Sequence, residues 1–448
     1  MVAREAIVKE RLSIAVFGLW HLGCVTAASL AQEGFRVRGL DSNEEVIAGL
    51  KSGKPPIFEP GLSELIAHTQ AAGNLSVTSD YKEALSDADV IWVTFDTPVD
   101  DEDRANVSYV EDQLDAAFPY IKSGAVIIIS SQVPVGFTDE LRRLWQARDV
   151  NKELIYCYSP ENLRLGKALE SFRAADRIVV GLDDDRDREL VQSILSRFCP
   201  HLEWMSVKSA EMTKHALNSF LAVSVAMINE IARICEQTGA DAKEVERGLK
   251  SESRIGSGAY LGPGGPFAGG TLARDLRFLV QLGENCRVQT PLLSGALISN
   301  DLHKNWVRDT AAALLKEVPK PARVTVLGLT YKPGTDTLRR SEAVSLALWL
   351  VEQGAEVIFH DPVVTHLPEG MAGRFHLTNN LKDALRGSDL LVIATSWPIY
   401  REEVVPELLT GTMRRAAVLD QNRFLEARLE GARGIVYMAV GKPRSYSR

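Results

Sequence analysis

Residues 13–41 have the sequence SIAVFGLWHLGCVTAASLAQEGFRVRGLD, and this stretch decides the fold class of the N-terminal part of the chain. It predicts a short apolar strand, a turn flanked by Gly18 and Gly23, a helix of small residues, and a second strand that ends in Asp41. This order is typical of a dinucleotide-binding βαβ unit, with an acidic residue about 20 positions beyond the turn. A phosphate held at such a turn lies at the N-terminus of the helix.

The alternation of strands and helices continues along the chain. Apolar stretches predict further strands at 75–79, 89–95, 125–131, 153–160 and 177–182. A second α/β block opens at RVTVLGL (323–329) and adds strands at 356–362, 389–396 and 416–420. Such alternation predicts parallel, doubly wound sheets. Both blocks open with the pattern V-x-G-L, which suggests an ancestral duplication.

Between the two blocks the pattern becomes helical. Residues 209–240 have an apolar period near 3.6 and predict one long helix, stopped by Gly239. Helical segments continue to about Leu315, and 317–323 has the composition of a linker. The expected fold is therefore α/β: two Rossmann-like doubly wound parallel-sheet domains joined by a central helical domain with one long helix. The expected domains are 1–207, 208–318 and 319–448.

Composition excludes several classes of protein. A chain of 448 residues is too long for one core. No apolar run approaches the roughly 20 residues that span a bilayer, and residues 1–13 lack the apolar core of a signal peptide. The five cysteines stand singly, which predicts a reducing cytoplasm and no metal cluster. A net charge of −8 argues against nucleic acid as the main partner.

The order of short motifs from residue 13 to about 400 resembles the UDP-glucose/GDP-mannose (nucleotide-sugar) dehydrogenase family. The matching motifs are FEPGL (58–62), TP (97–98), VPVG (133–136), SPENLRLGKA (159–168), DRIVVG (176–181), AEMTKHALNSFLA (210–222), INEIA (228–232), RIGSGAYLGPGGPFAGGTLARD (254–275), GLTYKPGTDTLRRS (328–341) and HDP (360–362). The resemblance implies an N-terminal NAD domain, a central helical domain that forms a homodimer, and a C-terminal domain that binds the nucleotide of a nucleoside-diphosphate sugar.

The resemblance also implies a set of NAD-binding residues. They are Gly18, Trp20, Leu22, Gly23, Asp41, Thr97, Gln132 and Arg339. Trp20 replaces the middle glycine of G-x-G-x-x-G, which normally lets the backbone approach the pyrophosphate. Two interpretations remain open: a rearranged turn in which the indole packs on the dinucleotide, or a turn that has lost tight NAD binding. For Asp41, the alternative to a ribose contact is a cap of the next helix.

Four residues match the catalytic positions of the family besides the nucleophile. Lys214 and Asn218 are one turn apart on the long helix and share a face. An ammonium group there stabilises the alkoxide that forms before hydride loss. Asp275 is expected to hold a water or Lys214 in place, the alternative being a carboxylate favoured at a helix start. Glu161 is expected to act as a base or to anchor a water.

Thr271 stands where the family has its nucleophilic cysteine. A thiolate adds to an aldehyde and, after a second hydride transfer, leaves a thioester, whereas a threonine hydroxyl is a far weaker nucleophile. The expected reaction therefore stops after two electrons, unless a hydrated aldehyde replaces the thioester. Cys157 is a substitute nucleophile in one interpretation and a buried structural residue in the other.

Substrate contacts are expected from residues that match the family's sugar and nucleotide sites. They are Arg164, Arg254, Tyr260, Gly264 and Lys332, with the arginine of RIG reaching the sugar site across the dimer. The chain is thus expected to be an NAD-dependent nucleotide-sugar dehydrogenase, most simply for a UDP-sugar. Two alternatives remain open: a redox-silent relative that binds a nucleotide sugar, and an epimerase-type enzyme with tightly bound NAD.

Overall fold

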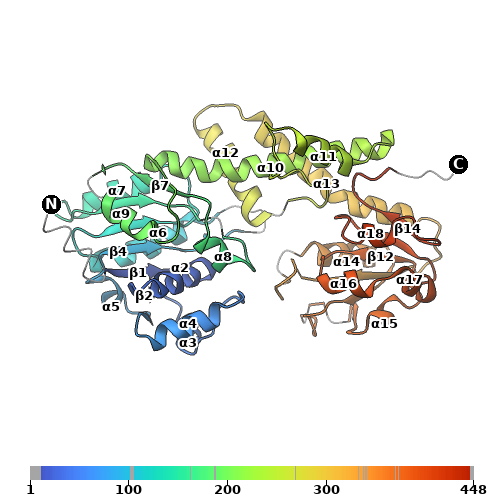
Figure 1. Cartoon of the computed structure of the whole chain (residues 1–448), viewed down its shortest axis with the longest axis horizontal. Helices are drawn as coiled ribbons and strands as arrows, with labels where there is room; N and C mark the ends of the chain where they lie inside the picture. Colours follow the sequence, from blue (N-terminus) through green and yellow to red (C-terminus); the bar gives the residue numbers. More distant parts are fainter. Residues whose placement is uncertain are drawn as a thin grey trace. The chain divides into compact units, whose positions relative to one another are not determined.

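The structure is a computed structural model that describes residues 12–100, 105–161, 163–185, 188–267, 269–330, 332–336, 338, 341–368, 370–371 and 373–443 (Figure 1). The chain divides into two compact units, Met1–Leu217 and Asn218–Arg448. The division falls within the long helix α10 (Val207–Thr238). Each unit is described by itself.

Unit 1 is built on one sheet of eight strands. In chain order they are β1 (Ser13–Phe17), β2 (Arg36–Leu40), β3 (Leu75–Thr78), β4 (Val90–Val93), β5 (Val126–Ile129), β6 (Ile155–Tyr158), β7 (Ile178–Leu182) and β8 (Leu202–Met205). Their spatial order is β3-β2-β1-β4-β5-β6-β7-β8. The first six follow the 3-2-1-4-5-6 order of dinucleotide-binding folds.

Helices cover both faces of this sheet (Figure 1). They are α2 (His21–Gln32), α3 (Glu44–Lys51), α4 (Leu62–Ala71), α5 (Tyr81–Leu85), α6 (Val107–Ala117), η1 (Phe118–Tyr120), α7 (Phe137–Arg148), α8 (Ala168–Arg173) and α9 (Arg188–Leu195). Successive residues of β1 enter two different cores, since Ile14 and Val16 pack on one face and Ala15 and Phe17 on the other. Burial on both faces explains why this strand is a continuous apolar run.

The expectation of an entirely parallel sheet is wrong at one pair of strands. β7 runs antiparallel to β6, with Cys157 opposite Leu182. The helix between them, α8, has only six residues. The chain re-enters the sheet at the carboxyl edge where β6 ends, as neighbouring antiparallel strands do. β8, which no sequence pattern predicted, then pairs parallel to β7.

Unit 2 contains a second sheet of the same strand order. Its strands are β9 (Arg323–Leu327), β10 (Glu356–His360), β11 (His376–Leu377), β12 (Leu390–Ile393), β13 (Ala417–Leu419) and β14 (Val436–Met438), in the order β11-β10-β9-β12-β13-β14. The described ladders of this sheet are all parallel. The predicted fold class, two Rossmann-like sheets joined by helices, is confirmed.

The two sheets also share a detail that supports duplication. In unit 1, the amide of Leu19 donates to Asp41 over 2.7 Å. In unit 2, the amide of Leu329 donates to Asp361 over 2.7 Å. In both cases a carboxylate at the end of the second strand holds the glycine turn that follows the first strand.

The central helices of unit 2 begin with α10. It ends at Thr238, and Gly239 follows with a φ of +83°, as the predicted stop requires. By length and composition alone α10 would pass for a membrane span, and 50% of its most apolar window is buried inside the protein. The remaining helices are α11 (Ala242–Ser251), the π-type turn η3 (Gly269–Ala273), α12 (Arg274–Asn285), α13 (Pro291–Leu315), α14 (Glu342–Glu352), α15 (Leu381–Leu385), α16 (Pro398–Glu403), α17 (Pro406–Thr412) and α18 (Glu426–Leu429).

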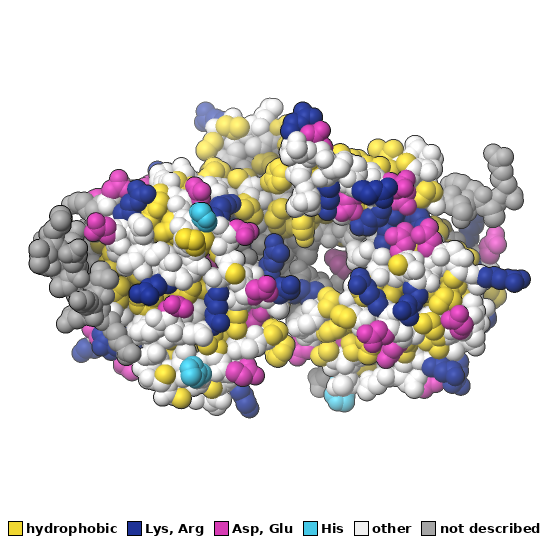
Figure 2. Space-filling view, viewed as in Figure 1, with side chains coloured by type: hydrophobic (Ala, Val, Ile, Leu, Met, Phe, Trp, Pro, Cys, Tyr) yellow, Lys and Arg dark blue, Asp and Glu magenta, His cyan; other side chains and the backbone are white. Residues whose placement is uncertain are grey.

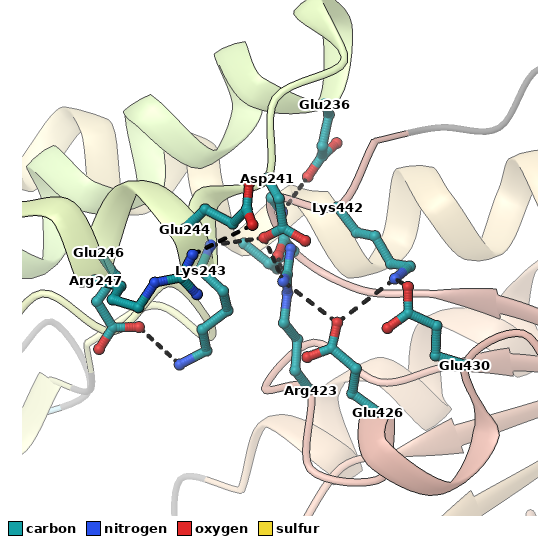
Figure 3. Close-up of polar contacts among 12 residues, drawn as sticks. Glu236, Asp241, Lys243, Glu244, Glu246, Arg247, Arg423, Glu426, Glu430 and Lys442 are labelled. Carbon is teal, nitrogen blue, oxygen red and sulfur yellow. Dashed lines mark hydrogen bonds and ion pairs between the residues drawn. The ribbon is translucent and has the colours of Figure 1, made fainter.

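An ion-pair cluster joins the central helices to the second sheet domain (Figure 3). The buried guanidinium of Arg423 donates to Asp241 over 2.6 Å and to Glu426 over 3.3 Å. Lys442 lies between Glu426 and Glu430. Asp241 is the N-cap of α11, Arg423, Glu426 and Glu430 lie in or next to α18, and Lys442 follows β14. These groups therefore tie three separate stretches of unit 2 together. Elsewhere, on the face that Figure 2 draws, acidic and basic side chains are interspersed.

Candidate active site

The turn between β1 and α2 has the features of a phosphate site. Trp20 is the N-cap residue of α2 and makes no side-chain cap hydrogen bond. The first-turn amides of α2 therefore receive no capping acceptor from this residue, and amides of this kind are the donors that bind phosphate at a helix N-terminus. The backbone of Trp20 is extended, with a φ of −86°, so the turn itself does not require glycine there. Its side chain is 41% exposed, which leaves the indole beside the turn rather than in the core.

The two glycines that flank the turn are both required by geometry. Gly18 has a φ of +97°, a conformation that favours glycine. A Cβ on Gly23 would lie 1.8 Å from the carbonyl oxygen of Gly18. The close packing of α2 on β1 therefore depends on Gly23, while the predicted cofactor residue Leu22 is half-buried next to it.

Asp41 holds the turn from the end of β2. Its carboxylate accepts from the amides of Leu19 (2.7 Å) and Asn43 (2.9 Å) and is almost fully buried. The alternative that Asp41 caps the next helix is wrong, because Asn43 is the N-cap of α3 and accepts from Glu45. Asp41 instead fixes the shape of the β1–α2 turn.

A buried carboxylate that sequence reasoning missed links this turn to the SPENLRLGKA motif. Glu59, from the FEPGL motif, accepts from Nε2 of His21 (2.9 Å) and from the amides of Gly166 and Ala168 (both 2.8 Å). Its side chain is 1% exposed. The FEPGL motif (58–62) could have drawn attention to Glu59 in the sequence, but it does not reveal which residues donate to its carboxylate.

Two predicted cofactor residues meet at the carboxyl ends of β4 and β5. The hydroxyl of Thr97 donates to the carbonyl oxygen of Gln132 over 2.7 Å. Thr97 is buried and Gln132 is half-buried. The structure thus brings the TP motif and the segment before VPVG together at one edge of the sheet.

The first turns of α10 are anchored to the same edge. Glu211 accepts from the amides of Gly136 (2.6 Å) and Thr138 (3.0 Å), and Nε2 of His215 donates to Val133 over 2.8 Å. Burial raises the pKa of Glu211, and the donors of Thr138 and Gly136 offset part of that rise. Neither Glu211 nor His215 was singled out from the sequence.

Lys214 lies between these two anchors. It is nearly buried, and its Nζ donates to the backbone carbonyl oxygen of Glu161 over 2.6 Å. The structure therefore brings together the lysine and the SPENLR segment, through the backbone of Glu161 rather than its carboxylate. Glu161 is half-buried, and Arg164, further along the same segment, is exposed.

Asn218 and Asp275 form a buried pair within unit 2. Nδ2 of Asn218 donates to Oδ2 of Asp275, and both side chains are buried. Asp275 also lies in the first turn of α12, where the helix dipole favours a carboxylate. It therefore occupies a helix start, as the alternative interpretation expected, and also pairs with Asn218. Thr271, in η3 just before this helix, is exposed. That Asp275 also lies near Lys214 remains a prediction.

Polar side chains position the glycine-rich loop of unit 2. The amides of Gly264 and Gly265 donate to Asn229 (3.0 Å) and Asn422 (2.9 Å), respectively. Nε2 of His303 donates to the carbonyl oxygen of Gly264 over 2.7 Å. The backbone of Gly264 is thus engaged by protein groups, and a Cβ there would lie 2.7 Å from Asn422. None of these three side chains was predicted.

The other expected substrate residues of unit 2 are exposed or half-buried. Arg254 has an 86% exposed side chain that pairs with Glu252 over 3.0 Å. Tyr260 is exposed, and Lys332 is half-buried. The predicted cofactor residue Arg339 lies outside the described residues.

Cys157 does not have the environment of a nucleophile. It is fully buried in the core of unit 1, and burial raises the pKa of its thiol to about 12. A thiol with this pKa is protonated at neutral pH and is inert. Within the part of the chain that the structure describes, no group of three or more His, Cys, Asp or Glu residues is placed to hold a metal ion.

Three family models match the chain in succession. They describe the UDP-glucose/GDP-mannose dehydrogenase family and cover its NAD binding domain (residues 12–199), its central domain (208–302) and its UDP binding domain (325–427).

Individual relatives match over nearly the full length. The UDP-glucose 6-dehydrogenase of Pseudomonas aeruginosa is 30% identical over 97% of this chain and 98% of its own. That of Rhizobium meliloti is 31% identical over 96% of this chain and 100% of its own. Among solved structures, a UDP-glucose dehydrogenase from Pyrobaculum islandicum superposes with a TM-score of 0.85 at 28% identity, over 97% of this chain and 98% of that one.

Proposed function

Because this chain belongs to the UDP-glucose/GDP-mannose dehydrogenase family, we propose that it oxidises a nucleoside-diphosphate sugar, a UDP-sugar first of all, with NAD as the cofactor. It is an NAD-dependent oxidoreductase that acts on a CH–OH group. The domains assigned to these tasks are 1–207 for NAD, 208–318 for dimerisation and 319–448 for the nucleotide of the sugar.

The observation that carries the proposal is the placement of polar groups on consecutive turns of α10. Lys214 is nearly buried and donates to the Glu161 backbone, and Asn218 is buried against Asp275. A buried ammonium group is strongly attracted to an alkoxide, because little water screens it. Asn218 would add a neutral donor, and Asp275 would hold that donor in place. Glu161 would anchor a water.

The cofactor turn fits a bound dinucleotide. The uncapped N-terminus of α2 offers amide donors to a pyrophosphate, and Gly18, Gly23, Leu22 and Asp41 shape the turn around it. NAD, when bound, supplies the acceptor for a hydride. Trp20 would pack on the dinucleotide, and Thr97 and Gln132 would line its path. Arg339 is proposed as a further NAD contact from the sequence motif alone.

Thr271 limits the reaction to two electrons in this proposal. Thr271 is exposed just before α12, and the sequence motif aligns its hydroxyl with the thiol that would form a thioester. A threonine hydroxyl does not form that intermediate without a strong adjacent base. The product is therefore an aldehyde or a ketone. Arg164, Arg254, Tyr260, Gly264 and Lys332 would bind the nucleotide sugar.

We further propose a homodimer that forms through the central helices. Three exposed apolar side chains lie seven residues apart along α10: Phe220 (69% exposed), Met227 (43%) and Ile234 (61%). On α13, Leu292, Ile298 and Leu302 are also exposed. A row with a seven-residue period forms one stripe on a helix, and a second copy of the stripe would cover it. The five free cysteines, four of them buried, fit a cytoplasmic location.

The decisive experiment counts NADH against sugar consumed. The purified protein is incubated with NAD and a panel of UDP- and GDP-sugars, and NADH absorbance is compared with the product determined by mass spectrometry. One NADH per sugar supports the proposal, and two would contradict the limit set by Thr271. A protein that binds a UDP-sugar but shows no NAD affinity would support the redox-silent alternative. NAD that co-purifies without net NADH would support an epimerase.

A further inference from the structure

The carboxylate of Glu59 lies between two segments of unit 1 that are distant in sequence. Its Oε2 accepts from Nε2 of His21 (2.9 Å) and from the amide of Gly166 (2.8 Å). Its Oε1 accepts from the amide of Ala168 (2.8 Å). With a side chain only 1% exposed, Glu59 is surrounded by donors and has little access to water. Three donors on one buried carboxylate form a rigid, charge-assisted junction.

Each side of this junction belongs to a different part of the proposed site. His21 is the first residue of α2, whose N-terminus receives the pyrophosphate in the proposed function. Gly166 and Ala168 end the segment 161–168, which begins at the residue whose carbonyl oxygen accepts from Lys214. A movement at one side must displace the shared carboxylate or break a buried hydrogen bond, which is unfavourable because the buried donor or acceptor is left unpaired.

We propose that His21 and Glu59 are positioning residues that couple cofactor binding at the α2 turn to the conformation of segment 161–168. This inference rests on the proposed function, because it takes the α2 turn as the NAD site. An anion at the first-turn amides fixes His21, His21 fixes Glu59, and Glu59 fixes the amides of Gly166 and Ala168. The loop that carries Glu161 and Arg164 is then ordered before the sugar binds.

The test is amide hydrogen exchange with and without saturating NAD, followed by mass spectrometry of peptides over 18–23 and 161–168. In the wild-type protein we expect NAD to slow exchange in both segments. In His21→Asn, whose side chain is too short to reach Glu59, NAD should still protect 18–23. The NAD-dependent protection of 161–168 should fall by about fivefold, the low end of coupling between two sites.

Two further variants separate coupling from simple destabilisation. His21→Gln keeps an N–H donor at similar reach and should restore the NAD-dependent protection of 161–168. His68→Asn removes an exposed histidine of α4 in the same unit and should leave both segments unchanged. NAD-dependent protection of 161–168 that is as large in His21→Asn as in the wild type would overturn the inference. If NAD protects neither segment of the wild-type protein, the cofactor assignment fails, and the coupling with it.

Discussion

Thr271 is the residue on which the proposed outcome of the reaction depends. It is exposed in η3, and Asp275 follows it in the first turn of α12 and pairs with Asn218. The proposed catalytic pair of Asn218 and Asp275 is therefore combined with the hydroxyl of Thr271 rather than with a thiol. Because a thiolate is intrinsically far more nucleophilic than a hydroxyl, this one side chain separates two-electron from four-electron chemistry.

Restoring the thiol should extend the reaction. We expect Thr271→Cys to raise the NADH formed per sugar from about one towards two and to yield a carboxylate, because an exposed cysteine can form a thioester. The measurement is NADH absorbance together with mass spectrometry of the sugar product. Thr271→Ser, which keeps a hydroxyl, is the matched control and should behave like the wild type. A Thr271→Cys protein that still yields only aldehyde or ketone would show that another residue limits the reaction.

Lys214 should be required for the chemical step. Lys214→Ala removes the charge that stabilises the alkoxide and should lower kcat by about 10²–10³-fold, with NAD affinity nearly unchanged. Steady-state kinetics and NAD titration by fluorescence measure the two quantities. Lys208→Ala, in the first turn of the same helix, removes an exposed lysine that pairs with Asp139 and should change neither. Equal losses in both variants would assign the effect to α10 stability instead.

At the scale of elements, the packing of α2 on β1 sets the cofactor turn. Gly23→Ala would place a methyl group against the Gly18 carbonyl oxygen. Backbone atoms cannot yield as a flexible side chain can, so we expect a loss of about 3 kcal/mol in the free energy of unfolding and loss of NAD binding. Urea denaturation and NAD titration test this.

A glycine in an open helical position provides the control for this substitution. Gly248 lies in α11, where an added methyl group would meet no atom within 4 Å, and its φ is not positive. Gly248→Ala should raise the free energy of unfolding by about 0.5–1 kcal/mol, because alanine has the higher helix propensity. A similar loss in both variants would mean that the close contact at Gly23 is not the cause.

The junction of α10 and α11 with the second sheet domain should make unit 2 sensitive to acid. Burial raises the pKa of Asp241, but the Lys243 amide and the Arg423 guanidinium outweigh it and hold the pKa below its ordinary value. Because the folded pKa is below the unfolded value, the carboxylate stabilises the protein above about pH 4. That contribution is lost as pH falls through the folded pKa.

Asp241→Asn should therefore cost about 1–2 kcal/mol of unfolding free energy at pH 7 and much less near pH 3. Urea denaturation at the two pH values gives the difference. Asp301→Asn breaks an exposed pair with Lys304 and should change stability by less than about 0.5 kcal/mol at either pH. An Asp241→Asn effect that does not depend on pH would contradict the assigned role of its charge.

At the scale of the whole molecule, the apolar stripe on α10 predicts the assembly. Met227→Glu and Ile234→Glu together should raise the dimer Kd by about 100-fold, because charges would be buried without partners in the interface. Sedimentation velocity over a range of protein concentrations measures the shift. Val150→Glu alters an exposed apolar residue of unit 1, 84% exposed, and should leave assembly unchanged. A wild-type protein that sediments as a monomer would refute the proposed dimer.

The sequence by itself determined the elements whose signals are local. The β1–turn–α2–β2 unit, the long central helix and its stop at Gly239 follow from apolar period and glycine placement, which neighbouring residues encode. The family motifs also located Lys214, Asn218, Asp275 and Thr271 without any structure. These features depend on a few residues at fixed spacing, so a linear pattern is sufficient to reveal them.

Only the tertiary structure decided which groups meet. The antiparallel β7 and the shared carboxylate of Glu59 both lie outside local patterns. The bond from His21 to Glu59 spans 38 residues of sequence, and that from Gly265 to Asn422 spans 157. Such contacts form because packing brings buried donors to the acceptors that can satisfy them, and no periodicity in the chain records that choice.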